Sequence, residues 1–273
     1  MTRIAVLQMT SGIDPEANAA VLADAAEAAA RGGAAMLFTP EMSGLVDRDR
    51  ERAAPNVVGE ADSPALTAVC GAAARHGIWI ALGSLAVARD DGDWANRSLL
   101  VDATGKVVAR YDKIHMFDVQ LASGETWRES AAYLPGEQVV TAETPAGRLG
   151  LTVCYDIRFP ALFQELGHRN CDLIAIPAAF TVPTGKAHWH LLQRARAVEA
   201  SAYVVAAAQV GKHADGRTTY GHSLVVDPWG EVLLDMGGEE PGLGFAEIDP
   251  QRIAAVRAQL PSLANRRAIP TSL

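Results

Sequence analysis

The chain carries little positive charge and no basic cluster. Its 273 residues include 24 Lys and Arg against 32 Asp and Glu, which gives a formal net charge of −8. Because nucleic-acid backbones are bound by concentrated Lys and Arg side chains, this composition argues against a nucleic-acid partner. A protein that acts on small molecules fits the charge balance better.

Long apolar runs and cysteine pairs are also missing. The N-terminal stretch MTRIAVLQMTSG turns polar too early for the apolar region of a signal peptide or for a membrane span. The three cysteines, Cys70, Cys154 and Cys171, lack the CxxC spacing of a zinc site, and a chain of this size needs no disulfide staples. We therefore expect reduced thiols, a cytoplasmic location, no membrane partner and no metal.

Strand-like and helix-like segments alternate along the chain, and 49% of its residues are hydrophobic. No linker rich in Pro, Gly or Ser divides it, so we expect a single domain over 1–273 with a C-terminal tail from about 250. The pattern alone predicts the α/β class. It predicts helices over 18–31, from Ser63-Pro64 to His76-Gly77, over 160–168 and over 188–202, and hairpins that turn at DATG and DPWG.

Three reactive side chains come directly after strand-like runs. Glu41 follows AMLFTP, Lys113 follows VVARYD and Cys154 follows LGLTV. Residues just beyond strand ends line the ligand crevice of α/β proteins, and a carboxylate, an ammonium and a thiol together suit acyl transfer. Taken singly, Glu41 could be a solvated loop acid, Lys113 a surface lysine and Cys154 a core residue.

The flanking residues resemble a known family. LFTPEMSG, YDKIHMFDV and VCYDIRFPALF resemble, in order, the three signature segments of the nitrilase, or carbon–nitrogen hydrolase, superfamily. The resemblance covers essentially the whole chain. It implies a four-layer α-β-β-α sandwich, with Glu41 as general base, Lys113 as stabiliser of the intermediate and Cys154 as nucleophile. Glu129, in TWRES, corresponds to a second active-site glutamate that holds the lysine, and its alternative is an exposed loop acid.

The chemistry of such a triad follows from the side chains themselves. A thiol with a pKa near 8.5 is mostly protonated at neutral pH, so Cys154 needs help to become a thiolate. We expect Lys113 and nearby helix-start N–H groups to lower its pKa and Glu41 to take the proton. The N–H of Tyr155 and the Lys113 ammonium are expected to form an oxyanion hole. An amide would then be cleaved through a thioester acyl-enzyme, without a metal or organic cofactor.

Three further residues are candidates for substrate binding. Arg158, four residues after the nucleophile, could bind a substrate carboxylate through its planar guanidinium, or could instead form a structural ion pair with Asp156. Phe180 and Thr184 follow a strand end and could line the pocket, or could be ordinary loop residues. By analogy with the family, all three would hold a 2-oxoglutaryl group.

The histidines offer a competing interpretation. His115 lies beside Lys113 and could form a dyad with Cys154, although the sequence does not bring the two together. His188 and His190 are two residues apart, a spacing that points them to different faces of a helix and does not suit a metal pair. For His222 we expect a structural hydrogen bond.

The C-terminal half narrows the resemblance to one branch of the superfamily. YVVAAAQ, YGHS, VVDPWG and the LP…RR tail resemble the branch that contains the deaminated glutathione amidases and the omega-amidases, which implies hydrolysis of deaminated glutathione to 2-oxoglutarate and cysteinylglycine. The segment LASGETWRESAAYL matches little beyond GE and ES. The alternatives are an omega-amidase acting on 2-oxoglutaramate, a carbamoylase or nitrile hydrolase, and a non-catalytic protein on the same fold. Glu41, Lys113 and Cys154 together argue against the last. The branch also implies a homodimer, in which the apolar segment from Ile253 could take part.

Overall fold

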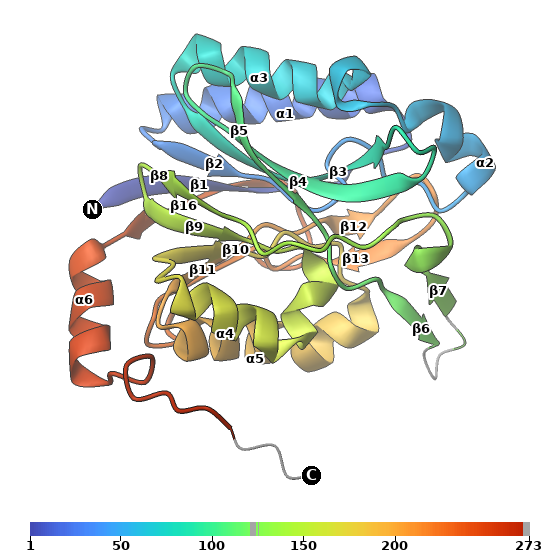
Figure 1. The fold of residues 1–273 in the computed structure, drawn as a ribbon. Helices are drawn as coiled ribbons and strands as arrows, with labels where there is room; N and C mark the ends of the chain where they lie inside the picture. Colours follow the sequence, from blue (N-terminus) through green and yellow to red (C-terminus); the bar gives the residue numbers. More distant parts are fainter. Residues whose placement is uncertain (121–123, 125, 270–273) are drawn as a thin grey trace.

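Two six-stranded sheets pack face to face, and helices cover the outer face of each (Figure 1). The computed structural model describes residues 1–120, 124 and 126–269. The first sheet contains, in spatial order, β16 (Gly242–Ile248), β1 (Thr2–Gln8), β2 (Met36–Phe38), β3 (Trp79–Ala88), β4 (Trp94–Val101) and β5 (Val107–Asp112). The second contains β15 (Val232–Asp235), β14 (Leu224–Val226), β11 (Tyr203–Ala206), β10 (Leu173–Ala175), β9 (Gly147–Leu151) and β8 (Thr141–Thr144).

The helices form the two outer layers. Helices α1 (Pro15–Arg31) and α3 (Pro64–His76) cover the first sheet, and α4 (Pro160–His168) and α5 (Val182–Ala200) cover the second (Figure 1). Buried apolar side chains fill the space between the sheets and the space under α1 and α3. The expected four-layer α-β-β-α sandwich is therefore confirmed.

Local signals set the helix boundaries. The Asp14 side chain accepts the N–H groups of Glu16 and Ala17 at the start of α1. The Ser63 hydroxyl accepts the N–H of Leu66 at the start of α3, which ends at Gly77 with a φ of 65°. The prediction for α3 is confirmed, and α4 spans 160–168 as expected. Helix α5 begins earlier than the sequence indicated, so Thr184 lies in its first turn rather than in a loop.

The chain returns to the first sheet near its end, because β16 pairs antiparallel with β1 over seven residues. The segment from 250 begins with a helix, α6 (Pro250–Gln259), capped by Asp249. Ile253 and Val256 on this helix are buried within the chain itself. The described part of the expected tail is thus a packed helix followed by an irregular segment.

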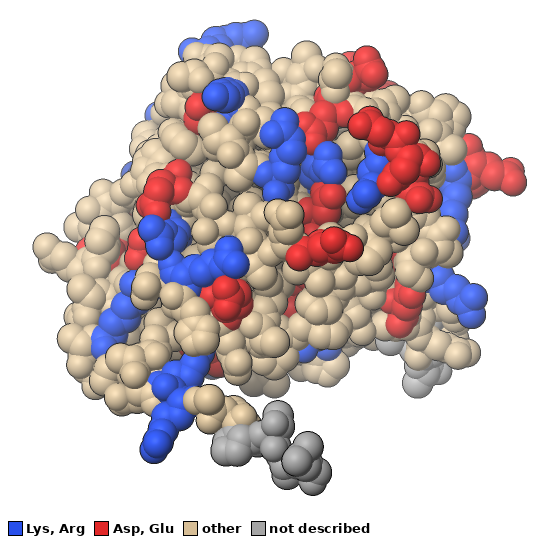
Figure 2. Space-filling model, viewed as in Figure 1, with Lys and Arg blue, Asp and Glu red and all other residues tan. Residues whose placement is uncertain are grey.

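Two short ribbons and a short helix lie toward the end of the sandwich opposite α6 (Figure 1). They are β6 (Asp118–Gln120) with β7 (Thr126–Arg128), β12 (Val210–Lys212) with β13 (Thr218–Tyr220), and α2 (Arg50–Ala53). On the face seen in Figure 2, acidic and basic side chains lie beside one another in several places on a surface that is mostly uncharged. Among the described helices, none combines the length and apolar character that crossing a bilayer requires.

Candidate active site

Glu41 lies on a loop that begins where β2 ends and that rests on an irregular part of β3. The pairing of β3 with β4 shifts register between Leu82 and Leu85, as at a β-bulge. Gly83 lies in this bulge, and a Cβ there would come within 2.0 Å of the Thr39 carbonyl oxygen. Ser84 accepts the N–H of Met42 through its hydroxyl. The bulge therefore fixes the loop that carries Glu41.

Lys113 follows β5 directly, and its ammonium lies between two carboxylates. Nζ is 3.0 Å from Glu41 Oε1 and 2.8 Å from Glu129 Oε2. The Lys113 side chain is only 2% exposed, so these ion pairs are shielded from water. The Phe117 N–H donates to Glu129 Oε2 at 2.7 Å, which holds the second carboxylate in place. The structure thus places Glu129 against Lys113 and not in solvent.

Asn96, on β4, joins the two glutamates and was not predicted from the sequence. Its Nδ2 donates to Glu41 Oε1 at 3.0 Å and to Glu129 Oε1 at 2.9 Å. The Lys113 N–H donates to the backbone carbonyl of Asn96 at 2.9 Å. In the part of the chain that the structure describes, its buried Oδ1 accepts no hydrogen bond. In the sequence, Asn96 is followed by two more polar residues, Arg97 and Ser98, so no local signal distinguished it.

Cys154 begins a short 3-10 helix, Cys154–Arg158, after β9, with a φ of 48°. This left-handed backbone is costly for a residue with a Cβ and needs support from its surroundings. The Cys154 N–H donates to the Pro177 carbonyl at 2.8 Å. The buried Asp156 carboxylate accepts the Val153 N–H at 2.9 Å and the Tyr111 hydroxyl at 2.7 Å. These bonds hold the thiol at the turn.

The charges favour a thiol, a carboxylate and an ammonium in the resting site. Burial would raise the pKa of Glu41, but Lys113 and hydrogen bonds from Cys154, Lys113 and Asn96 hold this pKa below 4.5. Burial would lower the pKa of Lys113, yet Glu129 and Glu41 raise it. Burial and the Glu41 charge raise the pKa of Cys154 despite Lys113. The expected lowering of the Cys154 pKa is therefore wrong, because burial and Glu41 outweigh the ammonium.

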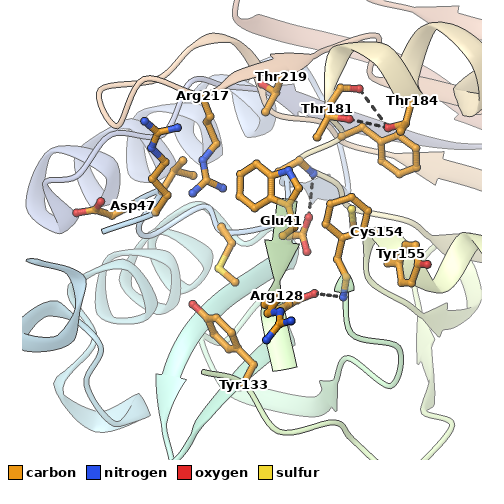
Figure 3. Close-up of a pocket in the computed structure, with 18 of the residues that line it drawn as sticks. Glu41, Asp47, Arg128, Tyr133, Cys154, Tyr155, Thr181, Thr184, Arg217 and Thr219 are labelled. Atoms are coloured by element: carbon orange, nitrogen blue, oxygen red, sulfur yellow. Dashed lines mark hydrogen bonds between the residues drawn. The ribbon is translucent and has the colours of Figure 1, made fainter. Parts of the chain in front are cut away.

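These side chains open onto a cavity of about 750 Å³ (Figure 3). Of the residues predicted from the sequence, its lining includes Glu41, Lys113, Glu129, Cys154, Tyr155, Arg158, Phe180 and Thr184. The Arg158 guanidinium lies 5.5 Å from the centre of the Phe180 ring and 5.8 Å from that of the Tyr155 ring. The partners of Asp156 are other groups, so the alternative ion pair with Arg158 is not formed.

The histidines lie outside this lining. The His115 ring is stacked on Phe159 with Nδ1 2.7 Å from Asp156 Oδ1, so it supports the turn that carries Cys154. Nδ1 of His188 lies 3.2 Å from Nη1 of Arg158. His190, His222 and Asp235 form a group whose ligand atoms lie within 4.8 Å of one another and could hold a metal ion. His222 Nδ1 is 2.9 Å from Asp235 Oδ1, as expected for a structural hydrogen bond.

The chain resembles known hydrolases over nearly its whole length. Residues 3–258 match the family model of the carbon-nitrogen hydrolases. A deaminated glutathione amidase of Yersinia enterocolitica is 39% identical over 272 residues, which cover 97% of this chain and 93% of that protein. The NitFhit crystal structure from C. elegans has a TM-score of 0.89 at 36% identity, over 97% of this chain and 65% of that longer chain. An amidase from Nesterenkonia sp. AN1, with acrylamide added to its active-site cysteine, has a TM-score of 0.80 at 30% identity, over 95% of this chain and 98% of that one.

Proposed function

The chain belongs to the carbon–nitrogen hydrolase family of the nitrilase superfamily, and we propose that it hydrolyses deaminated glutathione to 2-oxoglutarate and cysteinylglycine. The convergence of Glu41, Lys113 and Cys154 on one cavity carries this proposal. Relatives named deaminated glutathione amidase, including those of Yersinia enterocolitica and human, support the choice of substrate. A cavity of about 750 Å³ has room for a substrate of tripeptide size.

In the proposed cycle, Cys154 is the nucleophile and Glu41 moves the proton. The thiol proton passes to Glu41 as sulfur bonds to the amide carbon, and the oxyanion is stabilised by Lys113 and the N–H of Tyr155. The C–N bond then breaks, and the amine leaves with the proton from Glu41. Water attacks the resulting thioester and gives a proton to Glu41, the C–S bond breaks, and the thiolate recovers that proton.

The raised pKa of Cys154 makes Glu41 central to this cycle. Since the resting thiol is protonated, the base must take its proton during attack rather than find a thiolate already formed. Hydrogen bonds from Lys113, Asn96 and Ala179 keep Glu41 ionised and oriented for that transfer. Glu129 and Asn96 are proposed to position Lys113 and Glu41, without themselves touching the reacting atoms.

The acyl part of the substrate is proposed to lie against Arg158, Phe180 and Thr184. Arg158 would pair with the carboxylate of the 2-oxoglutaryl group, since its guanidinium lies beside two aromatic rings at the cavity wall. The Thr184 hydroxyl lies 2.8 Å from that of Thr181 and donates to the Thr181 carbonyl at 3.3 Å, and we propose that it turns this proton toward the substrate when the substrate binds.

We also propose a cytoplasmic homodimer. The three cysteines are free thiols, as a reducing compartment maintains them. Leu191, Val198, Trp229 and Leu233 are exposed apolar residues on α5 and around β15, and they support a dimer surface there. Ile253 is buried, which moves the expected interface away from α6. Sedimentation of wild type and Leu191→Asp tests this: a dimer that dissociates in the variant supports the surface, and an unaffected dimer contradicts it.

The substrate assignment is tested by measuring 2-oxoglutarate release from deaminated glutathione and from 2-oxoglutaramate, beside turnover of a simple carbamoyl amine. Wild type should prefer deaminated glutathione, and Cys154→Ala should be inactive with an unchanged thermal unfolding curve. Cys70→Ala, a free cysteine outside the cavity lining, is the matched control and should retain activity. Preference for 2-oxoglutaramate would make the protein an omega-amidase. Full activity of Cys154→Ala would overturn the mechanism.

A further inference from the structure

The cavity holds more positive charge than the proposed chemistry uses. Glu41 and Glu129 together carry one negative charge more than Lys113 balances, and Asp47, the third carboxylate in the lining, is 2.7 Å from Arg52 outside it. Five arginines nevertheless line the cavity: Arg48, Arg50, Arg128, Arg158 and Arg217. A cationic cavity in a chain of net charge −8 indicates an anionic ligand.

Two of these arginines already have partners or a proposed role. Arg50 donates from Nη1 to the Ala131 carbonyl at 3.1 Å and from Nη2 to the Arg128 carbonyl at 2.6 Å. Arg158 lies beside Tyr155 and Phe180 on the acyl side. Of the other three, Arg217 forms an ion pair with Asp215, whereas Arg48 and Arg128 have no carboxylate partner among the described residues.

Arg217 is held firmly while most of its donors stay available. Its Nε donates to Asp215 Oδ2 at 2.7 Å, and its guanidinium carbon lies 5.0 Å from the centre of the Trp127 ring. Within the described residues, no protein acceptor takes its two terminal amino groups. An anchored guanidinium loses little side-chain entropy when a carboxylate binds to it in bidentate fashion.

Arg48 lies beside Arg217 because both are tied to the same buried carboxylate. Asp215 Oδ2 accepts the backbone N–H of Arg48 at 2.9 Å, and Oδ1 accepts that of Arg217 at 3.0 Å. Arg48 Nη2 comes within 3.9 Å of the position of a Cβ built on Gly216. Asp215 thus fixes two cationic residues at one wall of the cavity.

This wall lies across the reacting groups from the acyl side. In Figure 3, Arg217 and Tyr155 lie on opposite sides of Glu41 and Cys154. A substrate whose acyl part faces Tyr155 and Phe180 would direct its leaving amine toward Arg217.

We propose that Arg217, assisted by Arg48, binds a carboxylate on the amine side of the scissile bond, so that the preferred substrates are amides of peptide-like amines that end in a carboxylate. This inference rests on the proposed function and deepens it. Two extended residues span about 7 Å. With the scissile amide at Cys154, the carboxylate at the end of the cysteinylglycine part would therefore lie about that far away, toward this wall. The ammonia released from 2-oxoglutaramate has no group to reach it. Arg217 would thereby set the choice between the two substrates.

The test compares wild type with Arg217→Gln on deaminated glutathione, on its C-terminal carboxamide and on 2-oxoglutaramate. Losing one charge-assisted carboxylate contact corresponds to about a 10- to 150-fold change. We expect kcat/KM for deaminated glutathione, divided by that for 2-oxoglutaramate, to fall by that factor in the variant. The carboxamide should already be poor in wild type and should lose little more. Arg31→Gln, which removes an exposed charge on α1, is the matched control.

A binding measurement separates this inference from the proposed function. Calorimetry with Cys154→Ala protein compares N-acetyl-cysteinylglycine with its C-terminal amide, with and without Arg217→Gln. Tighter binding of the carboxylate that vanishes with Arg217→Gln supports the subsite, even if deaminated glutathione is not turned over. Equal binding of the two ligands, or an equal loss for all three substrates in Arg217→Gln, overturns it.

Discussion

Replacing Glu41 by Gln should slow amide hydrolysis while making the Cys154 thiol more reactive. In the folded protein, Glu41 accepts hydrogen bonds from Lys113 Nζ at 3.0 Å, Asn96 Nδ2 at 3.0 Å and the Ala179 N–H at 2.9 Å. The first two reach Oε1 and the third reaches Oε2. Glutamine has the same shape but only one accepting oxygen, so one of these arrangements must be lost.

The cost to stability follows from that count. If the oxygen of the new carboxamide faces Lys113 and Asn96, the NH₂ group of the carboxamide faces the Ala179 N–H. The charge-assisted hydrogen bond from Ala179 is then lost. Such a bond is worth about 1.5–3 kcal/mol. Lys113 keeps its partner Glu129, so no buried ammonium is left alone. We expect the variant to fold, with a Tm lower by about 3–10 °C.

Hydrolysis and thiol reactivity should change in opposite directions. Loss of a general base lowers kcat by about 10²- to 10⁴-fold. Burial raises the pKa of Cys154 first and Glu41 second, while Lys113 lowers it. Removing the Glu41 charge leaves the burial and the ammonium, so the pKa of Cys154 falls and more thiolate is present at a given pH.

The assay is the rate of alkylation by iodoacetamide between pH 6 and 10, followed by intact mass and compared with 2-oxoglutarate release. The midpoint of alkylation should move to lower pH in Glu41→Gln. The Cys154→Ala/Glu41→Gln double variant corrects for labelling of Cys70 and Cys171. A midpoint that stays in place or moves upward would refute the assignment of Glu41 as the group that keeps Cys154 protonated.

Three further predictions follow from the site and its support. Asp156→Asn removes one accepting oxygen from a fully buried carboxylate that accepts several hydrogen bonds. Thermal unfolding should show that the free energy of unfolding falls by about 2–4 kcal/mol, and an unchanged Tm would contradict this. Gly83→Ala places a Cβ 2.0 Å from a carbonyl oxygen in the Glu41 loop, so it should lower the free energy of unfolding by at least about 3 kcal/mol and should also lower kcat. Gly71→Ala on α3, with open space around it, should be neutral or slightly stabilising by the same measurement. Because the pKa of Glu41 is lowered and that of Cys154 is raised, the pH profile of kcat/KM should be level across neutral pH and fall only toward strongly acidic and strongly alkaline pH, and a narrow bell centred near neutrality would oppose these pKa directions.

The elements that the sequence predicts well are those with strong local signals. Ser63-Pro64 and Gly77 bound α3 because capping and a left-handed end residue are local properties. The helix predicted over 188–202 begins later than α5 does, since Pro183 and Gly185 disfavour a helix and the first turn of α5 forms only where it packs. A Cβ on Gly185 would lie 2.2 Å from the Tyr220 ring, which shows how closely the first turn of α5 approaches β13. That contact joins segments 35 residues apart and leaves no pattern in either one.

The same distinction separates the predicted site residues from the ones that were missed. Glu41, Lys113 and Cys154 each stand at the end of an apolar run, where a reactive side chain is conspicuous. Asn96 lies inside a strand and Arg217 in the connection between β12 and β13. Each has its role through groups far away in the sequence: two glutamates for Asn96, and the cavity wall opposite Tyr155 for Arg217. The direction of the Cys154 pKa depends likewise on burial, which is a property of the folded chain. A sequence can therefore identify the groups that react, whereas their protonation and the choice of leaving group depend on side chains that only the fold brings together.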